Sequence, residues 1–229
     1  MPQEIIVVDK SLNFAGIDPT FAALHANLKP YEFKDASGNS IGGHYSMAMA
    51  YSNLAAKGVA TGTIFSLRWN DSKFLMVLLR LVMRKIDTIA YTAAAAQDFS
   101  ASKVTSYSTP ASGGTNIGLG GTGQKARGAS MNSSLLLSTG TVQLSSGDVL
   151  TAGVNTLDAQ PFGWALFFNG AVLGLPQEQI MYENRDNGKH PMIFAQQEGF
   201  VIQSPIGNAQ AAGVSKYAII MDWLEVPAF

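Results

Sequence analysis

The chain has 229 residues, of which 47% are hydrophobic and only 14% are charged, and its formal net charge is -1. Globular domains carry roughly 25% charged residues, so we expect part of this surface to face neighbouring molecules or to be covered by uncharged polar side chains. The near-zero net charge excludes a global field that would attract nucleic acid or an anionic membrane. The absence of Cys excludes disulfides, thiolate metal sites and a Cys nucleophile.

The N-terminal region predicts an arm followed by a short helix. No basic segment or long apolar run begins the chain, so we expect no signal peptide and a protein that stays in the cytoplasm where it is made. Asp18 at the N-cap and Pro19 at the first helical position predict a helix to about Leu28. An apolar strand at residues 5–8 is expected to dock on a neighbouring molecule. The expected interface residues are Ile5, Ile6, Val7, Val8 and Phe14.

Residues 64–86 give the clearest pattern. Phe65, Leu67 and Trp69 alternate with polar residues, which predicts a half-buried strand with Trp69 in the core. Turn-forming residues follow at 70–73, and residues 74–83 are almost continuously apolar. The apolar run is compatible with a buried strand or a short buried helix, and we predict a strand because the turn joins it directly to the preceding one. We therefore expect a hairpin covered by a second layer.

The remaining chain predicts short strands and polar turns. A loop rich in Gly, Ser and Thr spans residues 110–128 and is expected on the surface. Many short strands with Gly-rich turns are typical of a sandwich or jelly roll. We predict an all-β fold, with a jelly-roll-like β-sandwich at residues 43–229 and the arm and short helix at 1–42. Beyond the central stretch, strands are expected at 45–51, 133–137, 141–144, 164–168, 192–195, 200–203 and 217–226.

No motif in the sequence has the full context that a reaction or a cofactor requires. Residues 118–123 match GxGxxG but lack the flanking strand and helix of a dinucleotide site. The three histidines, His25, His44 and His190, form no pair at the spacing of metal ligands. A metal site built from His44, His190 and Glu198 is the one combination that stays open. We expect no metal and no cofactor.

The carboxylates near residue 180 leave one enzymatic alternative open. Glu178, Glu183 and Asp186 lie close enough in sequence for a glycosidase pair. Because the same loop also holds Arg185 and Lys189, a solvated surface is the favoured interpretation. Three basic residues are too few for nucleic-acid binding and are expected to neutralise neighbouring carboxylates: Arg80, Arg84 and Lys85.

Four segments carry a recognisable order of residues: Leu-Arg-Trp-Asn-Asp at 67–71, Leu-Thr-Ala-Gly-x-x-Thr-Leu-Asp-Ala-Gln-Pro at 150–161, His-Pro-x-x-x-Ala-Gln-x-Glu-Gly at 190–199 and Trp-x-Glu-Val at 223–226. From about Gly43 to the C-terminus, this order resembles a group of structural proteins of tailed bacteriophages. The group has no agreed catalytic residues to transfer to this chain. The resemblance implies a jelly-roll-like domain in a virion that assembles in the host cytoplasm.

The function expected from these observations is structural. A capsid decoration (cement) protein would bind the phage head as a homo-oligomer, expected to be a trimer, through the major capsid protein or other virion proteins. It would involve no nucleic acid, no membrane and no catalysis. One alternative is a tail or baseplate component that binds a host receptor or glycan through the long loop and exposed aromatics such as Tyr107. Another is a carbohydrate-degrading enzyme that uses Glu178 or Glu183.

Overall fold

A computed structural model provides the structure of the chain, which divides into two compact units, Met1–Tyr31 and Glu32–Phe229. The second unit starts before residue 43 because its first strand, at 32–34, pairs with the next one. The structure describes residues 16–18, 23–25, 32–34, 37, 40–48, 52–55, 62–92, 95–116, 132–138, 140–145, 149–151, 153–170, 173, 176–184, 191–204 and 213–228.

In the first unit, β1 (Gly16–Asp18) pairs antiparallel with β2 (Ala23–His25). The predicted helix from Asp18 to Leu28 is therefore wrong. A helix of about ten residues is marginal without tertiary packing, so its capping signals do not outweigh strand pairing. The arm at residues 5–8 and the other expected interface residue, Phe14, lie outside the described residues.

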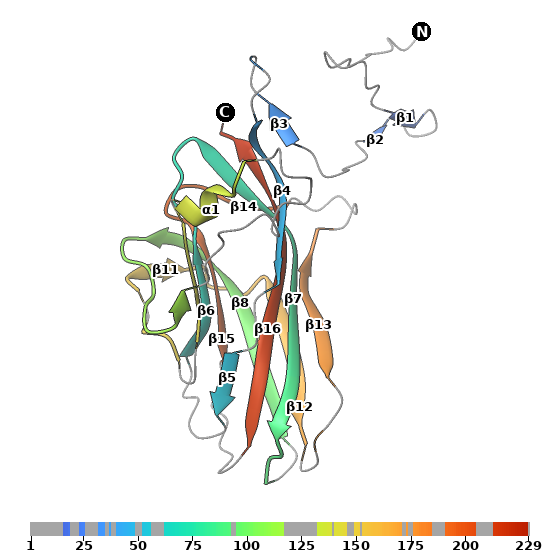
Figure 1. Ribbon diagram of the computed structural model, residues 1–229, viewed down its shortest axis with the longest axis vertical. Helices are drawn as coiled ribbons and strands as arrows, with labels where there is room; N and C mark the ends of the chain where they lie inside the picture. Colours follow the sequence, from blue (N-terminus) through green and yellow to red (C-terminus); the bar gives the residue numbers. More distant parts are fainter. Residues whose placement is uncertain are drawn as a thin grey trace. The chain divides into compact units, whose positions relative to one another are not determined.

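The second unit is a sandwich of two antiparallel sheets, which confirms the predicted all-β fold (Figure 1). Sheet I has the strand order β11-β8-β15-β6-β10-β9, with β12 also paired to β8. Neighbouring strands come from distant parts of the chain, as in jelly rolls. The strands of sheet I are β6 (Gly62–Arg68), β8 (Ala95–Tyr107), β9 (Thr115–Asn116), β10 (Thr141–Leu144), β11 (Asn155–Leu157), β12 (Gly163–Asn169) and β15 (Gly199–Ser204).

Sheet II is built around two long strands that pair along most of their length, β7 and β16. Its order is β13-β7-β16-β4-β3, with β14 also on β7 and β5 also on β16. The strands are β3 (Glu32–Lys34), β4 (Ser40–Ala48), β5 (Ser52–Ala55), β7 (Phe74–Ile89), β13 (Gln177–Glu183), β14 (Met192–Phe194) and β16 (Val214–Pro227).

The predicted strands at 64–70 and 74–83 are confirmed, but the predicted hairpin between them is wrong. The backbone of Trp69 pairs with Gln197 and Glu198, which extends the β6–β15 ladder of sheet I. β7 instead pairs with β16 in sheet II. The Asp71 side chain accepts the backbone N–H groups of residues 73 and 74, so the chain crosses from one sheet to the other through an Asx-type turn. The same turn residues are compatible with a hairpin or with an arch between sheets. Which of the two forms depends on the strands that pair with β6 and β7, and these strands lie far along the chain.

The core lies between the inner faces of the two sheets. On β16 the inward-facing residues Tyr217, Ile219, Met221 and Trp223 are all fully buried. Trp69 is buried as predicted. Sheet I contributes four aromatic residues that contact other rings of the core: Phe65, Phe99, Phe167 and Phe200.

Most of the later strand predictions are confirmed, but one is wrong and several strands, among them β8 and β13, were not predicted. Residues predicted as a strand at 133–137 include instead a helical turn, α1 (Leu135–Ser138), whose first N–H is bound by Glu225. The long strand β8 is not anticipated from its Ala- and Ser-rich sequence. The predicted loop at 110–128 includes the short strand β9, and residues 117–131 lie outside the described part. Among the described residues, no helix has the length and apolarity to cross a membrane.

Candidate functional site

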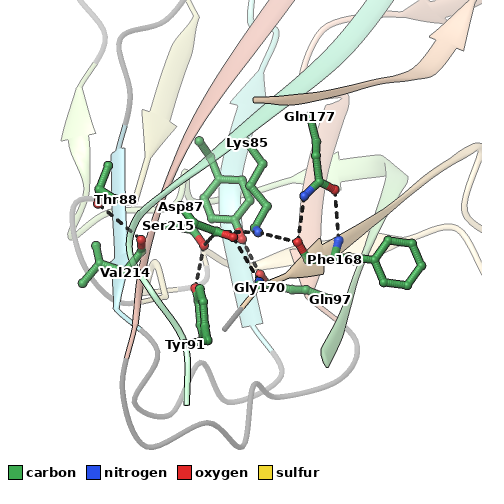
Figure 2. Close-up of polar contacts among 11 residues, drawn as sticks. Lys85, Asp87, Thr88, Tyr91, Gln97, Phe168, Gly170, Gln177, Val214 and Ser215 are labelled. Carbon is green, nitrogen blue, oxygen red and sulfur yellow. Dashed lines mark hydrogen bonds and ion pairs between the residues drawn. The ribbon is translucent and has the colours of Figure 1, made fainter. Parts of the chain in front are cut away.

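A group of polar side chains joined by hydrogen bonds lies inside the sandwich, where the inner face of β7 changes from apolar to charged (Figure 2). Lys85 and Asp87 follow Leu81 and Met83 on the same face, since side chains alternate along a strand. We call the group the inter-sheet polar cluster. It consists of Lys85, Asp87, Tyr91, Gln97, Ser215 and Tyr217.

An ion pair forms the centre of this cluster. The Lys85 Nζ lies 2.5 Å from the Asp87 Oδ1, and the two side chains are 0% and 3% exposed. The same ammonium donates to the backbone oxygen of Phe168 at 3.1 Å, and the N–H of Gly170 donates to Asp87 Oδ2 at 3.3 Å. Because Phe168 belongs to β12 and Lys85 to β7, these bonds join sheet I to sheet II (Figure 2).

Hydroxyl groups complete the cluster. Ser215 Oγ donates to Asp87 Oδ1 at 2.8 Å and lies 2.5 Å from the Tyr91 hydroxyl. The Tyr217 hydroxyl donates to Gln97 on β8, which is a second polar link between the sheets. Gly213, at φ 117°, packs so closely on the Tyr91 ring that a Cβ would lie 2.6 Å from it, so a side chain there would displace Tyr91.

Burial decides what this cluster does chemically. It lowers the pKa of Lys85, although the hydrogen bond and charge of Asp87 oppose the shift. It also raises the pKa of the Tyr91 phenol. A Ser, an Asp and a Lys in contact resemble hydrolytic constellations, but Ser215 is 0% exposed and its hydroxyl is bound to a carboxylate. The arrangement therefore holds the two sheets together.

A second buried carboxylate anchors α1. Glu225 is 0% exposed and accepts hydrogen bonds from the hydroxyl of Ser134 at 2.5 Å, the N–H of Leu135 at 3.0 Å and the indole of Trp223 at 3.0 Å. Burial raises the pKa of Glu225, and these hydrogen bonds act in the opposite direction. All of its contacts are internal, so Glu225 fixes the position of α1 against β16.

The accessible feature that stands out is one face of β12. Buried and exposed residues alternate strictly along this strand, with Ala165 and Phe167 pointing into the core. Its outer face carries three exposed apolar residues, which we call the β12 stripe: Trp164, Leu166 and Phe168.

Two glutamine side chains from β13 cover the free edge of β12. The Gln177 amide accepts the N–H of Phe168 at 3.0 Å and donates to its carbonyl at 2.7 Å (Figure 2). The Gln179 amide binds the N–H and the carbonyl of Leu166 in the same way. Each side-chain amide thus occupies the place that the backbone of a paired strand would take.

The structure separates the residues considered for catalysis. Glu178 lies in β13 and pairs with Arg84 at 3.0 Å, both side chains being more than 40% exposed, whereas Glu183 ends that strand opposite Arg80. Charge neutralisation is confirmed for Arg84 by this pair and for Lys85 by its pair with Asp87. Asp186 and Arg185 lie outside the described residues.

The candidate metal ligands are likewise not assembled by the described part of the chain. His44 is half-buried on β4, and burial lowers its pKa against the opposing charge of Asp222. Glu198 binds Lys103 at 3.2 Å and the N–H of Ala195. The described residues contain no group of three His, Cys, Asp or Glu able to hold a metal ion. His190 and the Gly-rich segment at 118–123 lie outside them.

Tyr107 corrects one expectation directly. The sequence placed it among exposed aromatics of a recognition face, but it is 0% exposed and its hydroxyl lies 2.8 Å from that of Ser66. It is covered because its side chain lies over β6, two strands away in sheet I. The Lys85–Asp87 pair and the β12 stripe were both missed. Signals for them existed: two opposite charges at i and i+2 beyond a buried run, and large apolar residues on both faces of one strand.

Comparison with known proteins adds no assignment. No protein-family model matches the chain, and a search of curated proteins finds no match. The resemblance to phage structural proteins therefore stays a prediction from the sequence.

Proposed function

We propose that this chain is a non-enzymatic structural subunit of a tailed-phage virion, and in particular a capsid decoration protein. In this proposal it forms homo-oligomers, expected to be trimers, on the outer face of the head and contacts the major capsid protein. The phage-like segments support the virion, and the low charge content supports a surface that is partly covered by neighbours.

The observation that carries the structural role is the concentration of exposed apolar side chains on a rigid edge of the sandwich. The β12 stripe stands on a strand bound on one side by β8 and on the other by two glutamine amides. The inter-sheet polar cluster fixes the end of the same strand. A preorganised apolar face suits binding to another protein, because little conformational entropy is lost when it docks.

Copy number in purified particles tests this function. A decoration protein is present at a copy number similar to that of the major capsid protein, which quantitative gel densitometry or mass spectrometry of washed particles measures. A handful of copies per particle would contradict the head assignment and favour the alternative, a tail or baseplate component that binds host receptor or glycan. Absence from the particle would contradict both.

A further inference from the structure

Exposed apolar side chains gather in one segment of the described chain. Nine large hydrophobic residues are exposed in the part that the structure describes, and five of them lie at positions 163–183. Trp164, Leu166 and Phe168 of the β12 stripe are 52%, 42% and 62% exposed. Leu173 lies in the connection to β13, and Ile180 lies on the face of β13 opposite to the glutamines that reach β12. Contiguous apolar patches on soluble proteins usually mark contact sites.

The edge of β12 determines how a partner meets this surface. An exposed edge strand normally invites another strand to add to the sheet through main-chain hydrogen bonds. Here Gln177 and Gln179 already bind the outward N–H and carbonyl groups of Phe168 and Leu166. A partner therefore packs on the side chains of the stripe rather than on the edge.

The stripe is close to a palindrome. Leu166 lies at its centre, and an aromatic ring stands two residues away on each side, Trp164 on one and Phe168 on the other. A patch in a twofold contact must be complementary to itself. When two such strands pack face to face and antiparallel, Leu166 meets its own counterpart and each Trp164 meets a Phe168.

We propose that the β12 stripe binds the β12 stripe of a second copy of this chain around a twofold axis at Leu166. This deepens the proposed structural function and depends on it for its biological setting. The contact joins two subunits, so a trimer formed elsewhere on the surface would be linked by it to a neighbouring trimer.

The available area fits the centre of such an interface. From its exposed fractions, the stripe offers on the order of 300–400 Å² per copy. A standard interface buries roughly 800 Å² per partner, so the stripe supplies about half. Polar residues around the stripe on the outer face of sheet I, Asp98 among them, supply the rim.

Asp98 on β8 distinguishes the two possible orientations of the two copies. It pairs with Leu166 in the β8–β12 register and lies on the same outer face. An antiparallel contact centred on Leu166 keeps β8 on the same side in both copies and brings the two Asp98 carboxylates toward each other. A parallel contact would place them on opposite sides. Neutralising Asp98 therefore strengthens only the antiparallel pair.

Trp164 supplies a direct readout in the intact protein. The chain has three Trp residues, and Trp69 and Trp223 are 0% exposed, so added acrylamide quenches mainly Trp164. Sedimentation equilibrium and acrylamide quenching of the full chain, over a range of protein concentrations, test the proposed contact. The wild type is expected to self-associate reversibly, with its quenching falling and its emission shifting to the blue as the associated fraction rises.

Matched variants locate the contact. Leu166→Asp is expected to abolish this association and leave Trp164 quenchable at every concentration, with an unchanged circular dichroism spectrum. Val154→Asp, at a residue 66% exposed outside the stripe, is expected to associate like the wild type. Asp98→Asn is expected to associate more tightly than the wild type.

Three results would overturn the inference: wild-type protein that stays monomeric at all concentrations, association that leaves Trp164 fully quenchable, or protection of Trp164 from quenching that survives Leu166→Asp. An Asp98→Asn variant that associates no more tightly overturns the antiparallel arrangement. None of these measurements uses phage particles. A negative result for the stripe contact is thus distinguishable from a negative result for the virion assignment, because only the copy number in particles tests the latter.

Discussion

The indole Nε1 of Trp69 donates a hydrogen bond to the backbone oxygen of Phe74 at 2.8 Å, across the turn that carries the chain from sheet I to sheet II. Trp69 is fully buried, and its own backbone N–H and carbonyl bind residues 198 and 197. One residue thus ends the β6 ladder, fills the core beneath the turn and fixes the first residue of β7. This relationship explains why 69–74 acts as an arch between sheets.

Trp69→Ala is expected to destabilise the protein by about 3–5 kcal/mol, because it removes a large buried side chain and leaves the Phe74 carbonyl without its donor. Trp164→Ala is the matched control, since that ring is 52% exposed. It should change the free energy of unfolding by less than about 1 kcal/mol. Urea unfolding of both variants measures the difference. Equal stability of Trp69→Ala and the wild type would show that the arch does not depend on this ring.

The Lys85–Asp87 pair predicts a different mutational pattern. Lys85→Met leaves a buried carboxylate without its cation and is expected to cost roughly 3–5 kcal/mol. The double variant Lys85→Met/Asp87→Leu should be less destabilised than the sum of the single changes, because no charge then remains buried. Arg84→Met, which breaks the exposed pair with Glu178 on the same strand, should cost at most about 1 kcal/mol. Additive effects of the two cluster substitutions would contradict this account.

Tyr107 makes stability depend on alkaline pH. Burial raises its pKa to about 12, against the opposing effects of the Ser66 hydrogen bond and Arg68. Between pH 10 and 12 the unfolded chain releases the phenol proton while the folded chain keeps it. Deprotonation stabilises the unfolded state relative to the folded state, so the free energy of unfolding falls with rising pH. A two-unit shift makes this loss roughly 3 kcal/mol in total.

Tyr107→Phe tests this dependence. At neutral pH the variant should be less stable by about 1 kcal/mol, because Ser66 loses its partner. The difference in unfolding free energy between the variant and the wild type should narrow above pH 10 and reverse by about pH 12, because only the wild type loses the contribution of Tyr107. The other tyrosines titrate equally in both proteins. Ser66→Ala keeps the phenol and should retain the alkaline loss. Parallel stability curves for Tyr107→Phe and the wild type from pH 8 to 12 would refute the assigned pKa shift.

The glutamine amides on β12 predict a local effect on hydrogen exchange. Gln177→Ala and Gln179→Ala should each speed exchange at one backbone amide, Phe168 and Leu166 respectively, and cost about 1 kcal/mol. An uncovered edge should also raise the tendency to aggregate. Glu178→Ala, between the two glutamines and bound to Arg84 instead, should leave both amides protected. Unchanged exchange in the glutamine variants would show that the amides do not protect the edge.

Local patterns in the sequence predicted much of the fold. The alternation around Phe65 and the apolar run after Phe74 identified β6 and β7, since each strand shows its buried face in its own residues. The sheet to which each belongs depends on β15 and β16, which lie far along the chain. β8 was missed because Ala and Ser give no apolar period, and its buried Ser100 and Ser102 are covered by neighbours.

The functional surfaces were harder to predict for a related reason. Charged residues are usually exposed, so only the partners of Lys85 and Asp87 on distant strands reveal that the pair is buried. In the sequence of β12, Trp164, Leu166 and Phe168 look no different from the buried Phe167. Which apolar face points outward depends on the register with β8. Local sequence patterns therefore predict where the strands are, whereas the pairing of strands determines which side chains remain exposed.

The apolar arm supplies the final prediction. The segment at residues 5–8 precedes the compact unit Glu32–Phe229, which provides the described buried core. A variant that begins at Ala15 is therefore expected to fold with unchanged unfolding free energy but to lose oligomerisation or particle binding. Burial of Ile5–Val8 against a partner contributes roughly 1.5–3 kcal/mol per side chain before ordering costs, so the loss of affinity should be large.

Sedimentation and particle-binding assays of the Ala15 variant measure this loss, and full-length protein with Ile6→Ser and Val8→Ser controls for chain length. Acrylamide quenching of Trp164 separates the arm from the β12 contact, because loss of the arm should leave any pairing through the stripe intact. A lowered melting temperature would mean that the arm packs on its own subunit. Unchanged oligomerisation together with unchanged particle affinity would exclude the arm as an interface, since at least one of these measurements must change if residues 5–8 bind a neighbour.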